Sequence, residues 1–296
     1  MVNSIDEYLK SLKQALSGCD NATQQDALAD AEEHLRTAIE SGLEESDKVL
    51  ESDILNEVIE KYGTPDEIAA AYREMENKLH PPLARTKQVA DRSILARFFG
   101  IFADPRAWGS LIYMIFALVT GIIYFTWTVT GISVGASTIF LIIGIPIIIL
   151  FLYSIRGITF VEGRIVEAML GERMPRRSKY TNKNISLWER IKNLLGDRTT
   201  WLGMLYMVLQ LPLGIIYFTV MITSIAVSIA LIFAPIMQFL MVYDIVYFGG
   251  EGYGPPTWTL PFVSLCGILL ITIVMHIARL TGKLHGKWAK LLLVSD

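Results

Sequence analysis

The sequence predicts an all-α protein in which a small acidic helical bundle precedes a polytopic helical membrane domain built from two tandem repeats. Of the 296 residues, 52 % are hydrophobic and only 19 % are charged, which is too apolar for an ordinary soluble domain. The charges are also divided unevenly. Residues 1–80 hold 19 Asp and Glu against 7 Lys and Arg, whereas residues 81–296 hold 10 against 19. A duplicated stretch is the third observation.

Residues 93–126 and 186–219 share one pattern. Aligned without a gap at an offset of 93, they are identical at 13 of 34 positions. Both copies contain an Asp-x-x-x-Trp entry, a tyrosine and a Gly-Ile-Ile-Tyr-Phe-Thr block. The signature residues are Asp104, Trp108 and Tyr113 in the first copy and Asp197, Trp201 and Tyr206 in the second. Such self-similarity indicates duplication, so we expect membrane repeats over residues 104–185 and 186–296.

The acidic head, residues 1–80, is expected to fold as a bundle of four helices. Apolar residues recur at helical spacing over residues 5–16, 28–38, 54–62 and 68–75. Ser52 is a candidate N-cap for the third helix, Gly63 a candidate end, and Thr64 with Glu67 a capping box for the fourth. Met75 is expected on the packed face of that helix, which should stop at residues 81–82. Because no basic-then-apolar signal pattern precedes the head, we expect it to lie in the cytoplasm.

The head resembles a known module. The stretches Ala27–Leu35 and Ile59–Ala69, the second containing Gly-Thr-Pro-Asp-Glu-Ile-Ala, are similar to those of the HAAS signalling domain. This resemblance implies a bacterial cytoplasmic helical module that serves signalling and interaction rather than catalysis. It also implies a protein partner, since such domains are often encoded beside PadR-type transcriptional regulators.

No motif in the head points to a metal or cofactor, and none is expected. His34 lies beside two glutamates, but helical neighbours do not converge on one point and no second ligand follows at a suitable spacing. Cys19 and Cys266 give no disulfide framework. The acidic surface is expected to be solvated, with a basic partner, including the protein's own basic loops, as the alternative.

Residues 81–103 and the start of the second repeat are expected to lie on the membrane surface. Both alternate cations with large apolar side chains, as interfacial amphipathic segments do. The candidate contacts to an anionic lipid bilayer are Arg85, Lys87, Arg92, Arg97, Arg190 and Lys192.

The first repeat is expected to cross the membrane as a helical hairpin. No charge interrupts residues 107–155, a length sufficient for two spans, and we place the outer turn near residues 130–135. Ten Lys and Arg over residues 156–198 indicate a cytoplasmic loop.

The second repeat carries about 30 additional residues. Arg279 and Lys287 align with Arg156 and Arg164 at an offset of 123, so we expect an insertion over residues 225–258. We interpret it as a re-entrant or interfacial excursion, which gives four spans and places both termini on one side. A fifth true span is the alternative.

The duplicated region as a whole resembles the Putative sensor membrane domain. The residues that carry the resemblance are the doubled Asp-x-x-x-Trp with its tyrosines, residues 212–214, and the closing Arg279, Leu280, Leu284 and His285. The resemblance implies a bacterial signalling protein. Because no kinase or other output domain follows in this sequence, we expect the output to pass through the head or a partner.

Few residues in the membrane half suggest chemistry, and no enzyme is expected. The paired Asp104 and Asp197 are interpreted as helix starts, with pairing to a neighbouring repeat's arginine as the alternative. Gln210 is expected to form a hydrogen bond between helices, or to line a cavity.

His276 is expected at a membrane-proximal helix end, and the Gly249–Pro256 stretch is expected to be a flexible turn. The candidate ligand or sensing residues are Gln210, Asp244, Tyr247, Glu251, Tyr253 and Trp258.

These patterns favour a non-catalytic signalling protein of the bacterial cytoplasmic membrane that couples membrane or envelope state to a cytoplasmic partner, without direct binding of nucleic acid. A small permease-like or accessory transport subunit is the alternative, since internal repeats with proline-containing runs also occur in transporters.

Overall fold

The computed structural model describes residues 4–45, 51–78, 93–138, 140, 144–177, 187–240, 246–248, 251–253 and 256–294. The chain forms two compact units. Unit 1 comprises Met1–Ala84, Gly131–Met204 and Trp288–Asp296, and unit 2 comprises Arg85–Thr130 and Leu205–Lys287. Three long helices contribute residues to both units, and each unit is described by itself.

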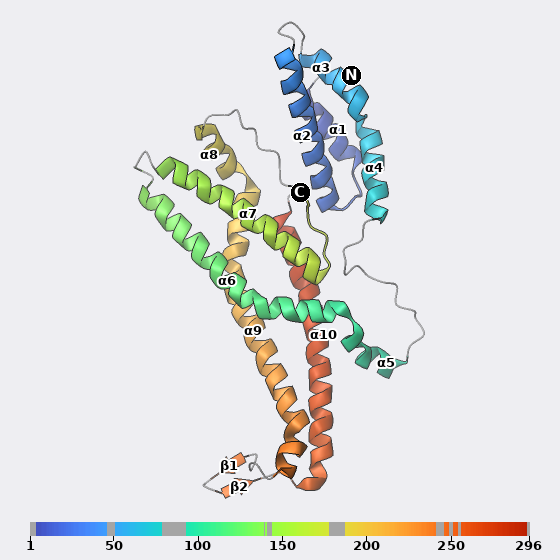
Figure 1. Ribbon diagram of the computed structural model, residues 1–296, viewed down its shortest axis with the longest axis vertical. Coiled ribbons are helices and arrows are strands. Elements are labelled where there is room, and N and C mark those ends of the chain that lie inside the picture. Colours follow the sequence, from blue (N-terminus) through green and yellow to red (C-terminus); the bar gives the residue numbers. More distant parts are fainter. Residues whose placement is uncertain are drawn as a thin grey trace. The chain divides into compact units, whose positions relative to one another are not determined.

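The head in unit 1 is a four-helix bundle (Figure 1). Its helices are α1 (Ile5–Ala15), α2 (Asn21–Glu45), α3 (Glu51–Tyr62) and α4 (Pro65–Lys78). The buried core contains Tyr8 and Leu12 from α1, Leu35 from α2 and Ala69 from α4. The Tyr8 hydroxyl donates a 2.7 Å hydrogen bond to the carbonyl oxygen of Gly63, and burial raises the pKa of Tyr8 to about 12. All four predicted helices are therefore present.

Local sequence signals set several boundaries of the bundle. The capping box is confirmed, because Thr64 N–H donates to Glu67 at 2.8 Å and Glu67 N–H donates to the Thr64 hydroxyl at 3.4 Å. Gly63 has φ 114°, the left-handed conformation predicted for a helix end. Two details were wrong. Ser52 is not the N-cap of α3, since the helix already includes Glu51, and Met75 is 44 % exposed rather than packed.

Unit 1 also contains α7 (Gly144–Leu170) and α8 (Leu187–Gly196). The outer turn predicted at residues 130–135 is wrong, because α6 (Pro105–Thr138) continues through it. A Cβ atom at Gly131 would lie 2.0 Å from the Phe151 ring of α7. This glycine therefore allows close helix packing and does not mark a turn.

Unit 2 is built around close contact of α6 with α9 (Arg198–Phe239). A Cβ atom at Gly121 would lie 2.7 Å from the Gln210 carbonyl oxygen, and one at Gly214 would lie 2.4 Å from the Ala117 carbonyl oxygen. The two glycines are 93 residues apart, and so are the two residues that they approach. The backbones touch reciprocally at these two points.

Unit 2 also contains the short elements α5 (Ile94–Phe99) and η1 (Gly100–Ala103) and most of the long α10 (Leu260–Leu293). Ile101, Met114, Met221 and Met275 lie together in a buried cluster. Helix α6 of the first predicted repeat and helices α9 and α10 of the second thus pack together with η1 in this core.

The second repeat forms a helical hairpin of α9 and α10, and its additional residues lengthen these two helices and the connection between them, here called the tip. Helix α9 runs without interruption past Ile225 and through Pro212 and Pro235 to Phe239, so the excursion expected from Ile225 does not begin there. With 42 residues, α9 is about 63 Å long, twice the roughly 30 Å of a bilayer core. It runs beside α10, where Ser264 donates to the Ile232 carbonyl oxygen at 3.2 Å (Figure 1).

The tip contains a short β-hairpin, which is a departure from the all-α prediction. Strand β1 (Val246–Phe248) pairs antiparallel with β2 (Glu251–Tyr253), with Val246 opposite Tyr253. The helix η2 (Thr257–Thr259) follows and leads into α10. Part of the stretch expected to be a flexible turn is therefore a strand.

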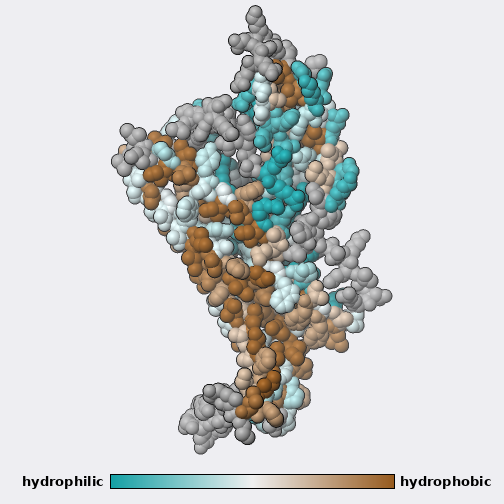
Figure 2. All heavy atoms as spheres, viewed as in Figure 1, coloured by the Kyte–Doolittle hydropathy of each residue, from teal (hydrophilic) through white to brown (hydrophobic). Residues whose placement is uncertain are grey.

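Four helices of the described chain, α6, α7, α9 and α10, are long and apolar enough to cross a membrane. This number agrees with the four spans favoured by the sequence. Figure 2 shows hydrophobic side chains gathered over the long helices and hydrophilic side chains over the bundle. The protein is therefore a multi-pass membrane protein with a helical N-terminal region.

Candidate functional site

A short basic segment after α7, residues 171–177, lies against the head within unit 1. Gly171, with φ 74°, follows the last residue of α7 and redirects the chain. The segment carries Arg173, Arg176 and Arg177, and its Met174 side chain is fully buried. The sequence indicated a basic loop here, and pairing of the acidic head with the protein's own basic loops was the alternative to a solvated surface; the ion pair of Arg177 with Asp30 fits that alternative.

The Asp26 carboxylate of α2 binds the backbone of this segment. Its Oδ1 accepts hydrogen bonds from the N–H groups of Arg176 and Arg177, at 2.6 and 2.9 Å. Only 7 % of Asp26 is exposed. Burial raises the pKa of Asp26, while the two N–H groups and the charges of Arg173 and Arg176 act in the opposite direction. The carboxylate is therefore a buried acceptor that fixes the path of the segment.

Asp30, one helical turn further along α2, joins the segment to the core of the head. Its Oδ1 lies 2.6 Å from Nη1 of Arg177, and its Oδ2 accepts from the hydroxyls of Tyr62 at 3.2 Å and Tyr72 at 3.1 Å. Burial, together with the Asp30 charge, raises the pKa of both tyrosines. Glu33 adds a weaker contact to Arg177 at 3.6 Å. One carboxylate thus holds α2, α3, α4 and Arg177.

Three further ion pairs support this arrangement. Glu167 of α7 is 2 % exposed and pairs with Arg164 and, at 3.0 Å, with Arg176. At the end of α10, Lys290 lies 2.5 Å from Asp20 of the head. Within the described part of the chain, Arg177 and Lys290 form ion pairs with acidic side chains of the head, which fits its acidic composition.

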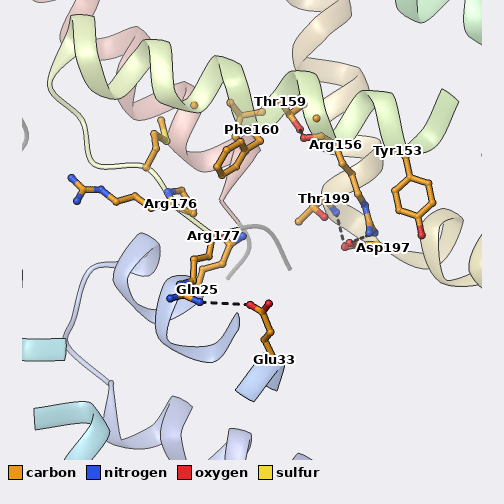
Figure 3. A pocket seen from close by; sticks show the side chains of 15 residues that line it. Gln25, Glu33, Tyr153, Arg156, Thr159, Phe160, Arg176, Arg177, Asp197 and Thr199 are labelled. Atoms are coloured by element: carbon orange, nitrogen blue, oxygen red, sulfur yellow. Dashed lines mark hydrogen bonds and ion pairs between the residues drawn. The ribbon is translucent and has the colours of Figure 1, made fainter. Parts of the chain in front are cut away.

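A pocket of about 670 Å³ opens between α7, the basic segment and the head. Figure 3 shows Arg156 and Asp197 directed toward one another on one side, and Arg177 beside Glu33 on another. The lining residues are Gln25, Glu33, Tyr153, Arg156, Gly157, Thr159, Phe160, Gly163, Met174, Pro175, Arg176, Arg177, Asp197, Thr199 and Leu293. It combines charged groups with an apolar wall.

The signature aspartates act both as helix starts and as arginine partners. Asp104 Oδ1 accepts from Arg106 N–H at 3.0 Å, and its Oδ2 lies 3.1 Å from Nε of Arg279. Asp197 Oδ1 accepts from Thr199 N–H at 3.1 Å, and its Oδ2 lies 2.7 Å from Nη2 of Arg156. Both aspartates therefore lie at helix starts and pair with an arginine of the other repeat, and a role in reporting the state of the bilayer stays a prediction.

The signature tryptophans also behave alike. The indole N–H of Trp108 donates to the Phe102 carbonyl oxygen at 2.9 Å, and that of Trp201 donates to the Leu195 carbonyl oxygen at 2.7 Å. Both rings are about half exposed. They fix the chain immediately before each long helix.

The signature tyrosines meet in a buried polar cluster in unit 2. The Tyr113 and Tyr206 hydroxyls lie 3.1 Å apart, and His285 Nε2 lies 2.8 Å from the first and 3.2 Å from the second. Gln210 Nε2 donates to the Tyr113 hydroxyl at 3.2 Å, and Tyr217 lies 3.3 Å from His285 Nδ1. Gln210 thus bonds between helices as predicted. The role of His285 was missed, because its spacing to other polar residues in the sequence suggests no site.

The predicted membrane-surface residues are only partly described. Arg97 in α5 and Lys192 in α8 are exposed, consistent with a surface position. Arg190 lies in α8, but its side chain is outside the described residues, as are Arg85, Lys87 and Arg92 altogether. Their contact with lipid stays a prediction.

The sensing candidates do not gather into one site in the described chain. Trp258 in η2 is 70 % exposed, whereas Gln210 is fully buried. Tyr247 lies in β1, and Glu251 and Tyr253 lie in β2. Asp244 and the side chains of these three residues are outside the described residues.

The other two histidines in the described part of the chain, His34 and His276, have structural contacts. The His34 ring stacks on Tyr62 at 4.5 Å. His276 Nε2 lies 3.0 Å from the Phe98 carbonyl oxygen, against whose ring it also stacks. Among the described residues, no group of three or more His, Cys, Asp or Glu side chains is placed to hold a metal ion.

Two family models match the chain. The HAAS model matches residues 7–71, and the model described as Putative sensor matches residues 113–293. The first covers most of the helical bundle, and the second covers α7, α8, α9 and α10 and most of α6. No curated protein and no solved structure matches the chain.

Proposed function

The chain belongs to the Putative sensor family and carries an N-terminal HAAS domain, and on this premise we propose that it is a non-catalytic membrane sensor whose head delivers the output. A sensor needs an element with two states, each favoured by a different input. The docked head is one such state. The other is a head released from residues 171–177, with its acidic face free for a cytoplasmic partner.

The contact of Asp26 and Asp30 with residues 171–177 is the observation that carries this proposal. It joins the segment directly after a membrane-crossing helix to the core of the head. A shift at the end of α7 would move Arg176 and Arg177 and thereby weaken bonds that also order Tyr62 and Tyr72. A change in the membrane helices would thus reach the surface of the head.

The orientation that fits this proposal has the head, the loop after α7 and the C-terminus together in the cytoplasm of a bacterium. Four spans return the chain to its starting side. The basic residues of the loop favour that side by the positive-inside rule.

We also propose that the two membrane segments arose by duplication. The paired contacts at Gly121 and Gly214, at Asp104 and Asp197, and at the two signature tryptophans support this idea, because each contact recurs at an offset of 93.

The transport alternative gains no specific support. Its sequence feature was an internal repeat with proline-containing apolar runs, and α9 runs without interruption through Pro212 and Pro235.

The experiment is capture of cytoplasmic partners by the full-length protein in a mild detergent. We expect Arg177→Glu, which places a carboxylate beside Asp30 and Glu33, to recover more of a transcriptional regulator than the wild type does. Arg177→Lys is the matched control, because it keeps the charge. Equal recovery by all three proteins would refute release of the head as the output, and capture of an ATPase would favour transport.

A further inference from the structure

We propose that the pocket beside α7 binds the phosphate group of an anionic amphiphile, with a membrane phospholipid as the source. This inference names the ligand of the proposed sensor, and its link to head release rests on the proposed function. Binding itself is a separate claim with its own measurement.

The charges of the pocket favour an anion. Three arginines line it, Arg156, Arg176 and Arg177, against two carboxylates, Glu33 and Asp197. Arginine presents a planar set of donors that matches phosphate oxygens. Arg176 and Arg177 are each close to half exposed despite their ion pairs, so they retain donors for a ligand.

The rest of the lining favours an amphiphile over a purely polar ion. Phe160, Met174, Pro175 and Leu293 form apolar surface in the same pocket. The volume of about 670 Å³ falls within the range of about 300–1,000 Å³ usual for small-molecule sites. Inorganic phosphate would fill only a small part of it, whereas a glycerophosphate with the start of an acyl chain would occupy both regions.

The pocket lies where a headgroup would be found. Arg156 is the first charged residue after the uncharged residues 107–155, and Asp197 directly precedes α9. These two residues therefore mark the level at which α7 and α9 enter lipid, close to the phosphates of the bilayer.

Binding at this place would compete with docking of the head. Arg177 and Glu33 line the pocket and contact one another, and Arg177 also pairs with Asp30. A phosphate held by Arg177 would replace these carboxylates as its partner. The ligand and the head would thus exclude one another at one side chain.

Gly157 offers a direct way to block the pocket. It lines the pocket from α7, and a Cβ atom added there would meet no atom within 4 Å. Gly157→Leu should therefore fill pocket space without straining the helix, and helix propensity favours the change. Gly157→Ala is the matched control, because it adds only one methyl group.

The experiment is titration of the full-length protein in an uncharged detergent with three probes: short-chain phosphatidic acid, short-chain phosphatidylcholine and inorganic phosphate. We expect saturable binding of phosphatidic acid, weakened at least about tenfold by Gly157→Leu and little by Gly157→Ala. Weak binding of the other two probes is expected. Equal binding of phosphatidic acid by the Leu variant and the wild type would overturn the site. Equal affinity for inorganic phosphate would overturn the lipid source and assign the pocket to a soluble phosphate compound.

Amide hydrogen exchange of residues 171–177 in the same samples separates this inference from the proposed function. If phosphatidic acid binds at the pocket but leaves this exchange unchanged, coupling to the head is refuted and the ligand site stands. If the segment is protected by the head but no probe binds, the ligand inference is refuted and the docked head stands.

Discussion

Arg177 Nη1 lies 2.6 Å from Asp30 Oδ1, and the other oxygen of this carboxylate accepts hydrogen bonds from Tyr62 and Tyr72. A side chain from the segment after a membrane helix therefore shares its partner with two tyrosines of the head. Any change in the position of Arg177 alters the charge balance at Asp30, and through it the packing of α3 and α4 against α2.

Reversing the charge of Arg177 should undock the head. In Arg177→Glu the ion pair with Asp30 is replaced by repulsion, which should cost the docked state about 1–2 kcal/mol, since the pair is partly exposed. Hydrogen exchange at residues 171–177 should accelerate roughly five- to thirtyfold. Arg177→Lys should exchange nearly as the wild type does, and unchanged exchange in Arg177→Glu would contradict the role of this pair.

For docking of the head, the hydrogen-bond acceptor oxygen of Asp26 should matter more than the negative charge of its side chain. Asp26→Ala removes the acceptor of two backbone N–H groups and should weaken docking by about 2–4 kcal/mol. Asp26→Asn keeps an oxygen in the same place and ends the burial of a charge, so it should dock almost as well. Protease sensitivity of residues 171–177 compares the two variants, and equal sensitivity would disprove this distinction.

The contribution of Asp26 to the stability of the docked head should fall as pH rises above about 3.8. Its pKa is raised in the folded protein, so the folded state holds the proton more tightly than the unfolded state. The contribution of Asp26 is therefore most favourable below its usual pKa of 3.8 and declines as pH rises through the raised value. The measurement is the unfolding free energy of the wild type minus that of Asp26→Asn, in which the other titrating groups largely cancel. A difference that grows with pH would be inconsistent with this sign.

The two close glycines of unit 2 should be equally intolerant of a side chain. A Cβ at Gly121 or Gly214 would press on the facing backbone at 2.7 or 2.4 Å, so Gly121→Ala and Gly214→Ala should each lose about 1–3 kcal/mol of stability. Thermal unfolding in detergent measures this loss. Gly157→Ala, in open space, should be neutral or slightly stabilising, and similar behaviour of all three variants would rule out the close approach.

Loss of the Tyr113 hydroxyl should destabilise the polar cluster more than loss of the Tyr206 hydroxyl. Tyr113 contacts Tyr206, His285 and the Gln210 side-chain amide, and Tyr206 contacts Tyr113 and His285. Tyr113→Phe would remove the partner of the Gln210 amide, at a cost of about 1–2 kcal/mol. Unfolding of the two phenylalanine variants in detergent makes the comparison, and the reverse order would contradict it.

The sequence by itself determined the local features of this protein. The capping box at Thr64 and Glu67, the left-handed Gly63 and the four apolar helices depend on residues within a few turns of one another, and their patterns are visible in the chain. The doubled aspartates were placed at helix starts for the same reason.

Only the tertiary structure decided which distant groups meet. Asp26 binds backbone 150 residues away, and His285 reaches Tyr113 from 172 residues away. The turn predicted near residues 130–135 is absent because α6 continues there, with Gly131 packed against the Phe151 ring of α7. The charge of a residue and the hydrophobic periodicity around it predict the kind of partner that its side chain will have, either an opposite charge or an apolar surface. These sequence patterns do not predict which of many chemically equivalent partners the side chain will contact, because the contact depends on how whole helices pack.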